Sequence, residues 1–339
     1  MNHSMQKPAK YKKLFEGFPR LRVLVIGDVM VDSYLWGKVE RISPEAPIPI
    51  VALKRRENRL GGASNVALNI KAMGAIPVLC SVIGKDEKGD RFMELLRQEK
   101  IETKYILRSP GRITTTKFRI FGNNLQMLRV DEEVEDRLSE QDRKAFARMI
   151  GGLLATTKID CIIFQDYDKG VITSSLIGEI VALARKQSIP VTVDPKRKNF
   201  LEYRGVTLFK PNLKELKEGL KLEMDPSDHS TVMKAAQLLL ERLDCTYVLA
   251  TMSEHGVLIS SKDAVSDRNI VIPAHIRSVA DVSGAGDTVI SVASLCLASK
   301  CSPYETAFIS NLAGGLVCEE VGVVPVNKEK LLKEVLALL

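Results

Sequence analysis

The sequence predicts an α/β protein in which helices cover both faces of a mostly parallel β-sheet. Short, uninterrupted apolar runs recur along the chain, as is typical of strands that are buried on both faces. Segments with helical periodicity lie between these runs, and this alternation indicates parallel strands joined by helices. Two further stretches fit neither pattern and predict a small β unit outside the main sheet.

The first predicted strand is Val23–Ile26, which ends at Gly27. Later strands are predicted at Val78–Ile83, Asp160–Phe164, Val191–Asp194, Val206–Phe209 and Tyr247–Ala250. Helices are predicted at Asn65–Met73, Lys88–Lys100, Ser139–Ala155, Ser174–Gln187, Leu213–Leu220 and Ser230–Leu243. Residues 1–20 are polar and basic, so we expect an N-terminal arm there, loosely ordered or a short helix, before one domain over 21–339.

The two irregular stretches are Tyr34–Lys54 and Thr114–Val130. The first is rich in proline and extended, and the second indicates two strands joined at Gly122-Asn123-Asn124. We expect a small β unit over about 34–55 and 112–130 that serves as a lid over a site or as a dimer surface. Ordinary surface hairpins are the alternative.

The composition is that of a globular cytoplasmic protein. The 339 residues carry a formal net charge of +7, which favours anionic small ligands weakly, fits a solvated basic surface equally well and does not imply nucleic-acid binding. The six cysteines form no C-x-x-C pair, which is typical of a reduced cytosolic chain. No apolar run approaches the roughly 20 residues of a membrane helix, and no signal peptide is visible.

Polar residues follow several of the predicted strands at their carboxyl ends, which is where open parallel sheets bind ligands. One such residue would be an ordinary turn or cap residue, but four strands that share the feature indicate a site. The residues are Asp28 and Asp32, Asp166 and Lys169, Asp194 and Lys196, and Asn212 and Glu215.

The segment Asp281–Thr288 carries the strongest functional signal. Gly284, Ala285 and Gly286 allow close approach to a ligand, and the following helix start would direct free N–H groups toward an anion. Asp287 would lie in the first helical turn, where it could take a proton from a hydroxyl that attacks phosphorus. A plain helix-start turn is the alternative, and neither a P-loop nor a G-x-G-x-x-G motif is present.

A second glycine cluster, Gly61-Gly62-Ala63-Ser64-Asn65, precedes a predicted helix. The glycines allow close approach of a polyhydroxylated ligand, and Asn65 offers a donor and an acceptor to its hydroxyls. A capped helix after a tight turn is again the alternative.

With these two glycine segments, the chain from Leu21 onward resembles the ribokinase-like, or PfkB, carbohydrate kinase family. The resemblance implies a three-layer Rossmann-like sandwich with a small β lid. It also implies ATP as phosphoryl donor, Mg²⁺ as cofactor and a homodimer formed through the lid, and it admits a monovalent cation.

Within this family the chain is most similar to the D-glycero-β-D-manno-heptose 7-phosphate kinases. This narrower resemblance rests on the segments Gly27–Asp32, Arg41–Pro47, Asp166–Gly170, Asp194–Lys196 and Pro211–Glu215. It implies phosphorylation of the anomeric hydroxyl of heptose 7-phosphate to the 1,7-bisphosphate, in ADP-heptose biosynthesis. A kinase of fructose, fructose 1-phosphate, ribose or a nucleoside is the alternative, and an inactive sugar- or nucleotide-binding regulator is a more distant one.

The resemblance also implies residue roles. Asp287 would be the base, and the amides of Gly284, Ala285 and Gly286 would stabilise the transferring phosphoryl group. The nucleotide would lie near Asn212, Glu215, Thr251, Gly256 and Asn311, with Glu215 reaching Mg²⁺ through water. The sugar would lie near Asp32, Gly61, Gly62 and Asn65. A 7-phosphate needs cationic partners, and Lys169, Lys196, Arg119 and Arg129, on or near the predicted strand ends and lid, are the candidates. For each of them an ion-pair role is the alternative.

Bifunctional relatives in this family add a nucleotidyltransferase domain with an H-x-G-H element. The histidines of this chain are His3, His229, His255 and His275, and no such element is present. We therefore expect a kinase-only chain, with a separate adenylyltransferase for the next step.

Overall fold

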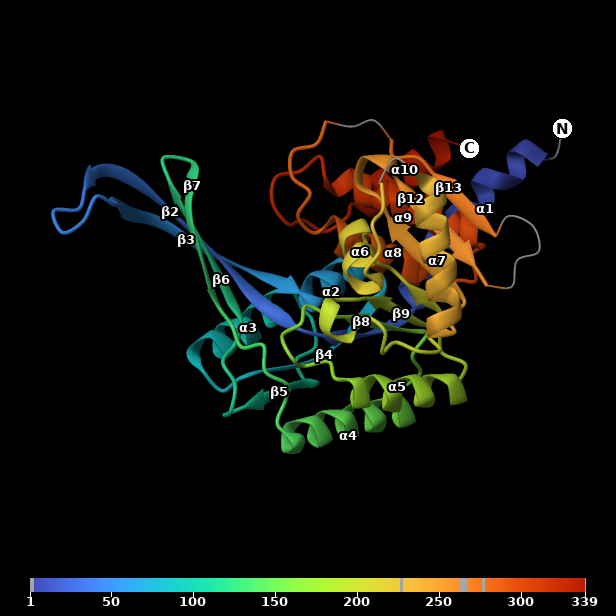
Figure 1. The fold of residues 1–339 in the computed structure, drawn as a ribbon, viewed down its shortest axis with the longest axis horizontal. Helices are drawn as coiled ribbons and strands as arrows, with labels where there is room; N and C mark the ends of the chain where they lie inside the picture. The colour runs from blue at the N-terminus through green and yellow to red at the C-terminus, as the bar shows by residue number, and fades with distance from the viewer. Residues whose placement is uncertain (1–2, 226–227, 263–267, 276–277, 339) are drawn as a thin grey trace.

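The computed structural model describes residues 3–225, 228–262, 268–275 and 278–338, which form a three-layer α/β core and a separate four-stranded sheet (Figure 1). The strands of the core sheet are, in chain order, β1 Arg22–Gly27, β4 Ile76–Gly84, β5 Ile106–Ser109, β8 Cys161–Gln165, β9 Val191–Asp194, β10 Leu208–Phe209, β11 Tyr247–Thr251, β12 Val257–Ser261 and β13 Asn269–Ile272. They lie in the order β13-β12-β11-β10-β9-β8-β1-β4-β5.

The core sheet is parallel from β5 to β11, which confirms the predicted mostly parallel sheet, although the sequence analysis did not identify β5. At the other edge β12 and β13 are antiparallel, and the sequence analysis did not identify them. The predicted strand at Val206–Phe209 shortens to Leu208–Phe209.

Alternate residues of the strands face two separate hydrophobic cores, one on each face of the sheet. In β1, Val23 and Val25 contribute to the first core and Leu24 and Ile26 to the second. The helices of the first core are α1 His3–Gly17, α2 Ala63–Ala72, α3 Glu87–Gln98, α8 Ala285–Ala298, α9 Pro303–Val317 and α10 Lys328–Ala337. Those of the second core are α4 Glu140–Thr156, α5 Ser174–Lys186, α6 Leu213–Leu220 and α7 His229–Leu243. No described helix is both long enough and apolar enough to cross a membrane.

The N-terminal segment is a helix that belongs to the core. α1 is followed by a short 3-10 helix over Phe18–Arg20, and the side chains of Tyr11, Phe15 and Phe18 are buried in the first core. Their spacing of four and three residues places the three rings on one side of the segment. The basic residues around them concealed this apolar stripe in the sequence.

The four-stranded sheet, which we call the lid, consists of β2 Val29–Ile42, β3 Pro49–Gly62, β6 Thr116–Gly122 and β7 Leu125–Glu132. It projects from one side of the core in the order β3-β2-β6-β7 (Figure 1). The strands extend beyond the expected ranges of 34–55 and 112–130. β2 begins two residues after β1 ends, and β3 ends directly before α2. The root of the lid therefore lies at the carboxyl ends of the core strands, where the sequence placed the site.

Candidate active site

The segment Asp281–Thr288 forms the start of α8, as predicted. Gly284 is the residue before the helix and adopts a φ of 82°, a conformation that favours glycine. Because Gly284 has no side chain, it does not cap the first-turn amides of α8, so they can receive a ligand's anionic oxygen. Asp287 lies in this first turn and is 7% exposed.

The carboxylate of Asp287 receives hydrogen bonds from three residues that are distant in the sequence. Asn65 donates from Nδ2 to Oδ2 over 2.7 Å. Gln165 donates from Nε2 to Oδ1 over 3.1 Å, and the hydroxyl of Tyr167 donates to the same oxygen over 2.7 Å. Oδ1 is thus held from the end of β8, whereas Oδ2 is held from the helix that follows the glycine pair.

Burial raises the pKa of Asp287 to about 6. The hydrogen bonds from Asn65 and Tyr167 and the charge of Lys210 oppose this rise, while the charge of Asp194 adds to it. Burial, together with the charge of Asp287, raises the pKa of Tyr167 well above its ordinary value, so Tyr167 stays protonated and keeps its donor. Asp287 therefore changes charge near neutral pH, as suits a group that takes up and releases a proton.

Two acceptors beside Asp287 are available to a ligand. In the described part of the chain, the side-chain oxygens Asn65 Oδ1 and Gln165 Oε1 are buried and have no hydrogen-bond partner. Buried polar atoms are normally paired, so each of these oxygens keeps the capacity to accept one more hydrogen bond, from a water or from a ligand hydroxyl.

The glycine pair before α2 lies at the same place. A side chain at Gly61 would collide with the carboxylate of Asp32. Gly62 has a φ of 61°, and a side chain there would collide with the main-chain oxygen of Asp28. Asp32 is buried in β2 and accepts a charged hydrogen bond from Arg119. The structure thus brings Gly61 next to Asp32 and Asn65 next to Asp287, with the glycine pair directly before the helix that carries Asn65.

A buried lysine, which the sequence analysis missed, lies across from the glycine turn of α8. Lys210 Nζ is 3.0 Å from Asp194 Oδ2, and both side chains are almost fully buried. A β-carbon placed on Gly286 would be 3.6 Å from Lys210 Nζ and 3.8 Å from Asp194 Oδ2. The signal in the sequence was the position of Lys210, directly after a buried strand and before Pro211-Asn212.

Gln165 and Tyr167 are also residues for which the sequence analysis gave no role. Gln165 ends β8 and donates both to Asp287 and, over 3.2 Å, to Asp194 Oδ2, so its amide joins the two carboxylates. A polar residue at the end of an apolar strand was the available signal for Gln165. Only the neighbouring strand order could show that its amide reaches Asp287.

Asn212 and Glu215 begin α6 and form a capping box. The side chain of Asn212 accepts from the amide of Glu215 over 2.9 Å, and Glu215 Oε2 accepts from the amide of Asn212 over 2.9 Å. The other carboxylate oxygen of Glu215 pairs with Lys196. Lys196 therefore has a carboxylate partner, and the side chain of Lys196 in this pair stays partly exposed.

These residues fit a magnesium ion that is held mainly by a nucleotide and by water. Among the described residues, no three His, Cys, Asp or Glu side chains converge into a metal cluster. Asp194 and Glu215 each have a lysine partner, which leaves them suited to contact through water.

The remaining residues predicted for the nucleotide side form one neighbourhood. Asn212 pairs with Thr251 in an isolated parallel bridge. Gly256 has a φ of 85°, and a side chain there would collide with the main chain at Ile272–Ala274. Asn311 donates to the main-chain oxygen of Pro273 over 3.0 Å. Gly256 and Asn311 therefore border the same short segment after β13.

The four basic residues considered for the sugar phosphate all have carboxylate partners. Lys169 contacts Glu133 at 2.7 Å and Glu135 at 3.0 Å, and Arg129 contacts Asp131 at 2.6 Å. Arg119 and Arg129 are directly opposite each other in β6 and β7. Arg119 is also opposite Tyr34, two residues from Asp32 in β2, so the two arginines share a lid face with Asp32. Lys169 and Lys196 belong to loops of the core.

Phosphoryl transfer to a sugar uses a base, a positive charge near the phosphate and partners for the sugar hydroxyls. The site offers Asp287, Lys210 and the unpaired oxygens of Asn65 and Gln165 for these three tasks. A model of the pfkB family of carbohydrate kinases matches residues 20–330. The chain belongs to this family. It is an ATP-dependent carbohydrate kinase with the ribokinase-like fold.

Curated relatives of this kinase include two proteins named Bifunctional protein HldE. That of Geobacter sulfurreducens is 37% identical over 317 residues, which are 93% of this chain and 63% of the relative. That of Helicobacter pylori is 38% identical over 301 residues, which are 89% of this chain and 63% of the relative. The chain thus spans less than two thirds of the length of these relatives.

Solved structures show the same fold at low sequence identity. Phosphofructokinase-2 from Escherichia coli in complex with potassium superimposes with a TM-score of 0.76 and 18% identity, and covers 94% of this chain and 99% of its own. Arabidopsis thaliana ribokinase complexed with ribose and ATP gives a TM-score of 0.69 and 15% identity, with 93% and 98% covered.

Proposed function

We propose that this kinase transfers the γ-phosphoryl group of ATP to the anomeric hydroxyl of D-glycero-D-manno-heptose 7-phosphate, with Asp287 as the general base. The observation that carries the proposal is the position of Asp287, buried in the first turn of α8 and beside two unpaired amide oxygens. The product would be the 1,7-bisphosphate, a precursor in ADP-heptose biosynthesis. The separate adenylyltransferase expected for the next step and the cytoplasmic location stay predictions.

The geometry supports Oδ2 of Asp287 as the oxygen that takes the proton. Oδ1 has two donors from the end of β8, whereas Oδ2 has one, from Asn65 on the side of the proposed sugar site. As the anomeric oxygen bonds to the γ-phosphorus, its proton passes to Asp287 and the bond from phosphorus to the β-γ bridging oxygen breaks. ADP leaves with that electron pair.

Charge on the transferring group would be stabilised by the first-turn amides of Gly284, Ala285 and Gly286. Lys210 lies next to this turn and adds a buried positive charge. Mg²⁺ bound to the nucleotide would neutralise phosphate charge, with Glu215 and Asn212 near it through water. Thr251, Gly256 and Asn311 would border the nucleotide. A monovalent-cation requirement stays a prediction.

Two arguments favour a heptose phosphate over other sugars. The curated relatives named HldE are 37% and 38% identical, whereas the matched phosphofructokinase-2 and ribokinase structures are 18% and 15% identical. Arg119 and Arg129 lie side by side on the lid face that carries Asp32, where they could bind a second phosphate of the sugar. Asp32, Gly61, Gly62 and Asn65 would bind its hydroxyls. Lys169 and Lys196 belong to loops of the core and not to this lid face, so they are weaker candidates for this phosphate.

We also propose that two copies of the chain associate through the opposite face of the lid. In β6 and β7 the cross-strand pairs Phe118–Val130 and Ile120–Leu128 lie on that face, one pair on each side of Arg119–Arg129 along the strands. Val130 and Leu128 are 43% and 55% exposed. A contiguous apolar face on a projecting sheet is typical of a protein interface.

The substrate is tested by turnover with ATP and a panel of acceptors. The panel contains heptose 7-phosphate, unphosphorylated heptose, fructose, fructose 1-phosphate, ribose and a nucleoside. We expect the highest kcat/KM for heptose 7-phosphate. Turnover of an unphosphorylated sugar or nucleoside without turnover of heptose 7-phosphate would refute the proposed acceptor.

The role of Asp287 is tested by Asp287→Asn. A general base contributes about 10²- to 10⁴-fold, so the variant should lose at least that in kcat while it still binds ATP and sugar phosphate. Near-normal turnover would remove Asp287 from the mechanism.

A further inference from the structure

The loop Asp166–Val171, which follows β8, contacts the proposed base at one end and encloses a buried carboxylate at the other. Tyr167, in this loop, gives its hydroxyl to Asp287. The main chain of the same loop gives three amides to Asp28, the first residue after β1. These are Tyr167 N to Oδ2 over 2.9 Å, Lys169 N to Oδ2 over 3.2 Å and Val171 N to Oδ1 over 3.0 Å.

The backbone of the loop explains why alternate amides converge. Asp168 and Gly170 have φ values of 58° and 84°, whereas Lys169, which lies between them, has no positive φ. This alternation turns the amides of Tyr167, Lys169 and Val171 to one side, and they form a concave anion site of the kind called a nest. Here the anion is internal: the carboxylate of Asp28, which is 1% exposed. The unusual loop conformation and the buried carboxylate thus stabilise each other.

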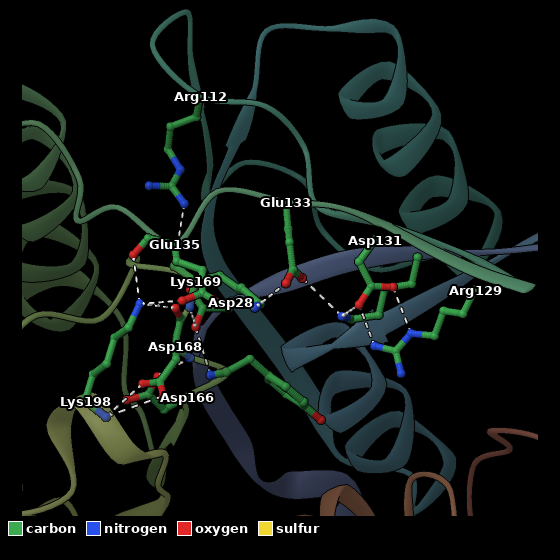
Figure 2. Close-up of polar contacts among 12 residues, drawn as sticks. Asp28, Arg112, Arg129, Asp131, Glu133, Glu135, Asp166, Asp168, Lys169 and Lys198 are labelled. Carbon is green, nitrogen blue, oxygen red and sulfur yellow. Dashed lines mark hydrogen bonds and ion pairs between the residues drawn. The ribbon is translucent and has the colours of Figure 1, made fainter.

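Neighbouring groups complete the support of this loop. Asp166 accepts from the hydroxyl of Tyr203 over 2.7 Å and from Asn199 over 2.9 Å. Lys169 extends its ammonium to Glu133 and Glu135, the residues that follow the lid strand β7 (Figure 2). Asp166 therefore connects the loop to the core, and Lys169 connects it to the root of the lid. Tyr167 connects it to Asp287.

We propose that Asp28 is a positioning residue: by filling the nest of loop 166–171, it holds the Tyr167 hydroxyl against Oδ1 of Asp287 and so orients the base. The proposal rests on the proposed function, because it takes Asp287 as the base. The side chain of Asp28 makes no hydrogen bond to Asp287, and its hydrogen bonds are to the main chain of loop 166–171. We therefore expect its effect on turnover to pass through Tyr167.

Charged and titratable groups around both carboxylates define how pH enters the test. Asp287 faces Asp194 at the end of β9, Lys196 in the loop after it and Lys210 after β10, in addition to Tyr167. Burial, and then the charge of Asp166, raise the pKa of Asp28 to about 6, and the loop amides oppose this rise. The charge of Asp28 also acts on Arg112 and Tyr203, and it favours the protonated form of each.

The sign of the pH effect follows from the Tyr167 bond, which lowers the pKa of Asp287. Loss of that bond raises this pKa, so the acid limb of the pH profile of kcat/KM moves to higher pH. If Asp28 acted by its own titration instead, its removal would take a group of pKa about 6 out of the profile, and the limb would not move upward.

The test compares Asp28→Asn, Tyr167→Phe and the double variant. An asparagine presents one acceptor and an N–H₂ group to three amides, so the nest loses its anion. We expect each single variant to lose about ten- to a hundredfold in kcat, the typical effect of one hydrogen bond to a charged group. We also expect each to shift the acid limb upward. The double variant should be no worse than the poorer single variant, because both changes remove one contact.

Asp160→Asn is the matched control. Asp160 also accepts a main-chain amide, from Arg22 over 2.8 Å, but at the opposite end of β1. It should leave the acid limb in place. Gly170→Ala is a second variant for the case that Asp28→Asn does not fold: a β-carbon there would collide with the main-chain oxygen of Asp136, which distorts the nest while Asp28 is kept.

Three results overturn the inference: an unmoved acid limb in Asp28→Asn, an unmoved limb in Gly170→Ala, or losses in kcat that multiply in the double variant. Failure of the proposed function has a different signature. In that case Asp287→Asn turns over normally, whatever Asp28→Asn does.

Discussion

The ammonium of Lys210 lies 3.0 Å from Oδ2 of Asp194, in a buried ion pair beside the glycine turn of α8. Asp194 also accepts from Gln165, which donates to Asp287 as well. The pair is therefore joined to the proposed base by one amide. We propose that this buried lysine transfers part of its interaction from Asp194 to a phosphate that binds at the turn.

Lys210→Met is expected to affect both stability and nucleotide use. Removal of one partner of a buried ion pair typically costs about 3–5 kcal/mol, because the other charge stays buried and unpaired. Denaturant unfolding should show this loss, and Lys210→Met with Asp194→Asn should recover part of it. In folded Lys210→Met protein, kcat should fall at least tenfold or the KM for ATP should rise by that factor. Unchanged ATP kinetics would restrict Lys210 to a structural role.

Asp287→Asn is expected to change how stability depends on pH. The pKa of Asp287 is raised to about 6 in the folded protein, from an unfolded value near 3.8. The folded state therefore binds this proton more tightly, and the stability it provides is full below pH 4 and is lost as pH rises through 6. Two pKa units correspond to about 3 kcal/mol.

Relative to the wild type, Asp287→Asn should thus gain up to about 3 kcal/mol in free energy of unfolding between pH 4 and pH 7. Urea unfolding of both proteins at the two pH values measures the difference, and other titrating groups cancel. A relative stability that stays constant, or that falls toward pH 7, would contradict the raised pKa. Asp160→Asn serves as a control for a carboxylate outside the site.

Local patterns in the sequence were sufficient for most of the fold. The apolar run Val23–Ile26 and the glycine turn at Gly284–Gly286 are strand and helix-start signals that depend on adjacent residues, and both lie where they were predicted. β12 and β13 were missed because antiparallel edge strands interrupt the regular alternation of strands and helices. The N-terminal segment was left undecided because basic residues surround its three buried rings, Tyr11, Phe15 and Phe18.

The contacts within the candidate site could be predicted only in part. Asn65 and Asp287 are 222 residues apart, and Tyr167 and Asp287 are 120 residues apart, so their contacts depend on strand order. The resemblance to a family brought Asn65 and Asp287 into one site without showing that they touch. Asp28 was visible as an acid after a strand, but its role as the anion of a main-chain nest depends on backbone angles 140 residues later.

The lid face that carries Phe118, Ile120, Leu128 and Val130 is expected to hold a dimer together. Leu128→Asp places a charge in the middle of this apolar face, opposite Ile120. Sedimentation should then show a shift from dimer to monomer, because a buried unpaired charge opposes association. Leu338→Asp is the matched control, since Leu338 is 46% exposed at the end of the chain, beyond α10. A monomeric wild type, or a dimer that persists in Leu128→Asp, would contradict the proposed interface.

Arg129 is the sharper of the two lid arginines for testing the second phosphate of the substrate. Arg119 also holds Asp32, so its removal would disturb the proposed hydroxyl contacts, whereas Arg129 pairs with Asp131 near the lid edge. If Arg129 binds the 7-phosphate, Arg129→Gln should raise the KM for heptose 7-phosphate about tenfold or more and leave the KM for ATP unchanged. With unphosphorylated heptose the variant and the wild type should have equal kcat/KM, because the group that Arg129 contacts is absent. An equal loss with both sugars would mean that Arg129 acts on lid structure, and an unchanged KM for heptose 7-phosphate would move the phosphate site to other cations.

Lys196→Met provides the comparison for Arg129→Gln. Because Lys196 pairs with Glu215 on the nucleotide side, its removal should change ATP kinetics more than the sugar-phosphate KM.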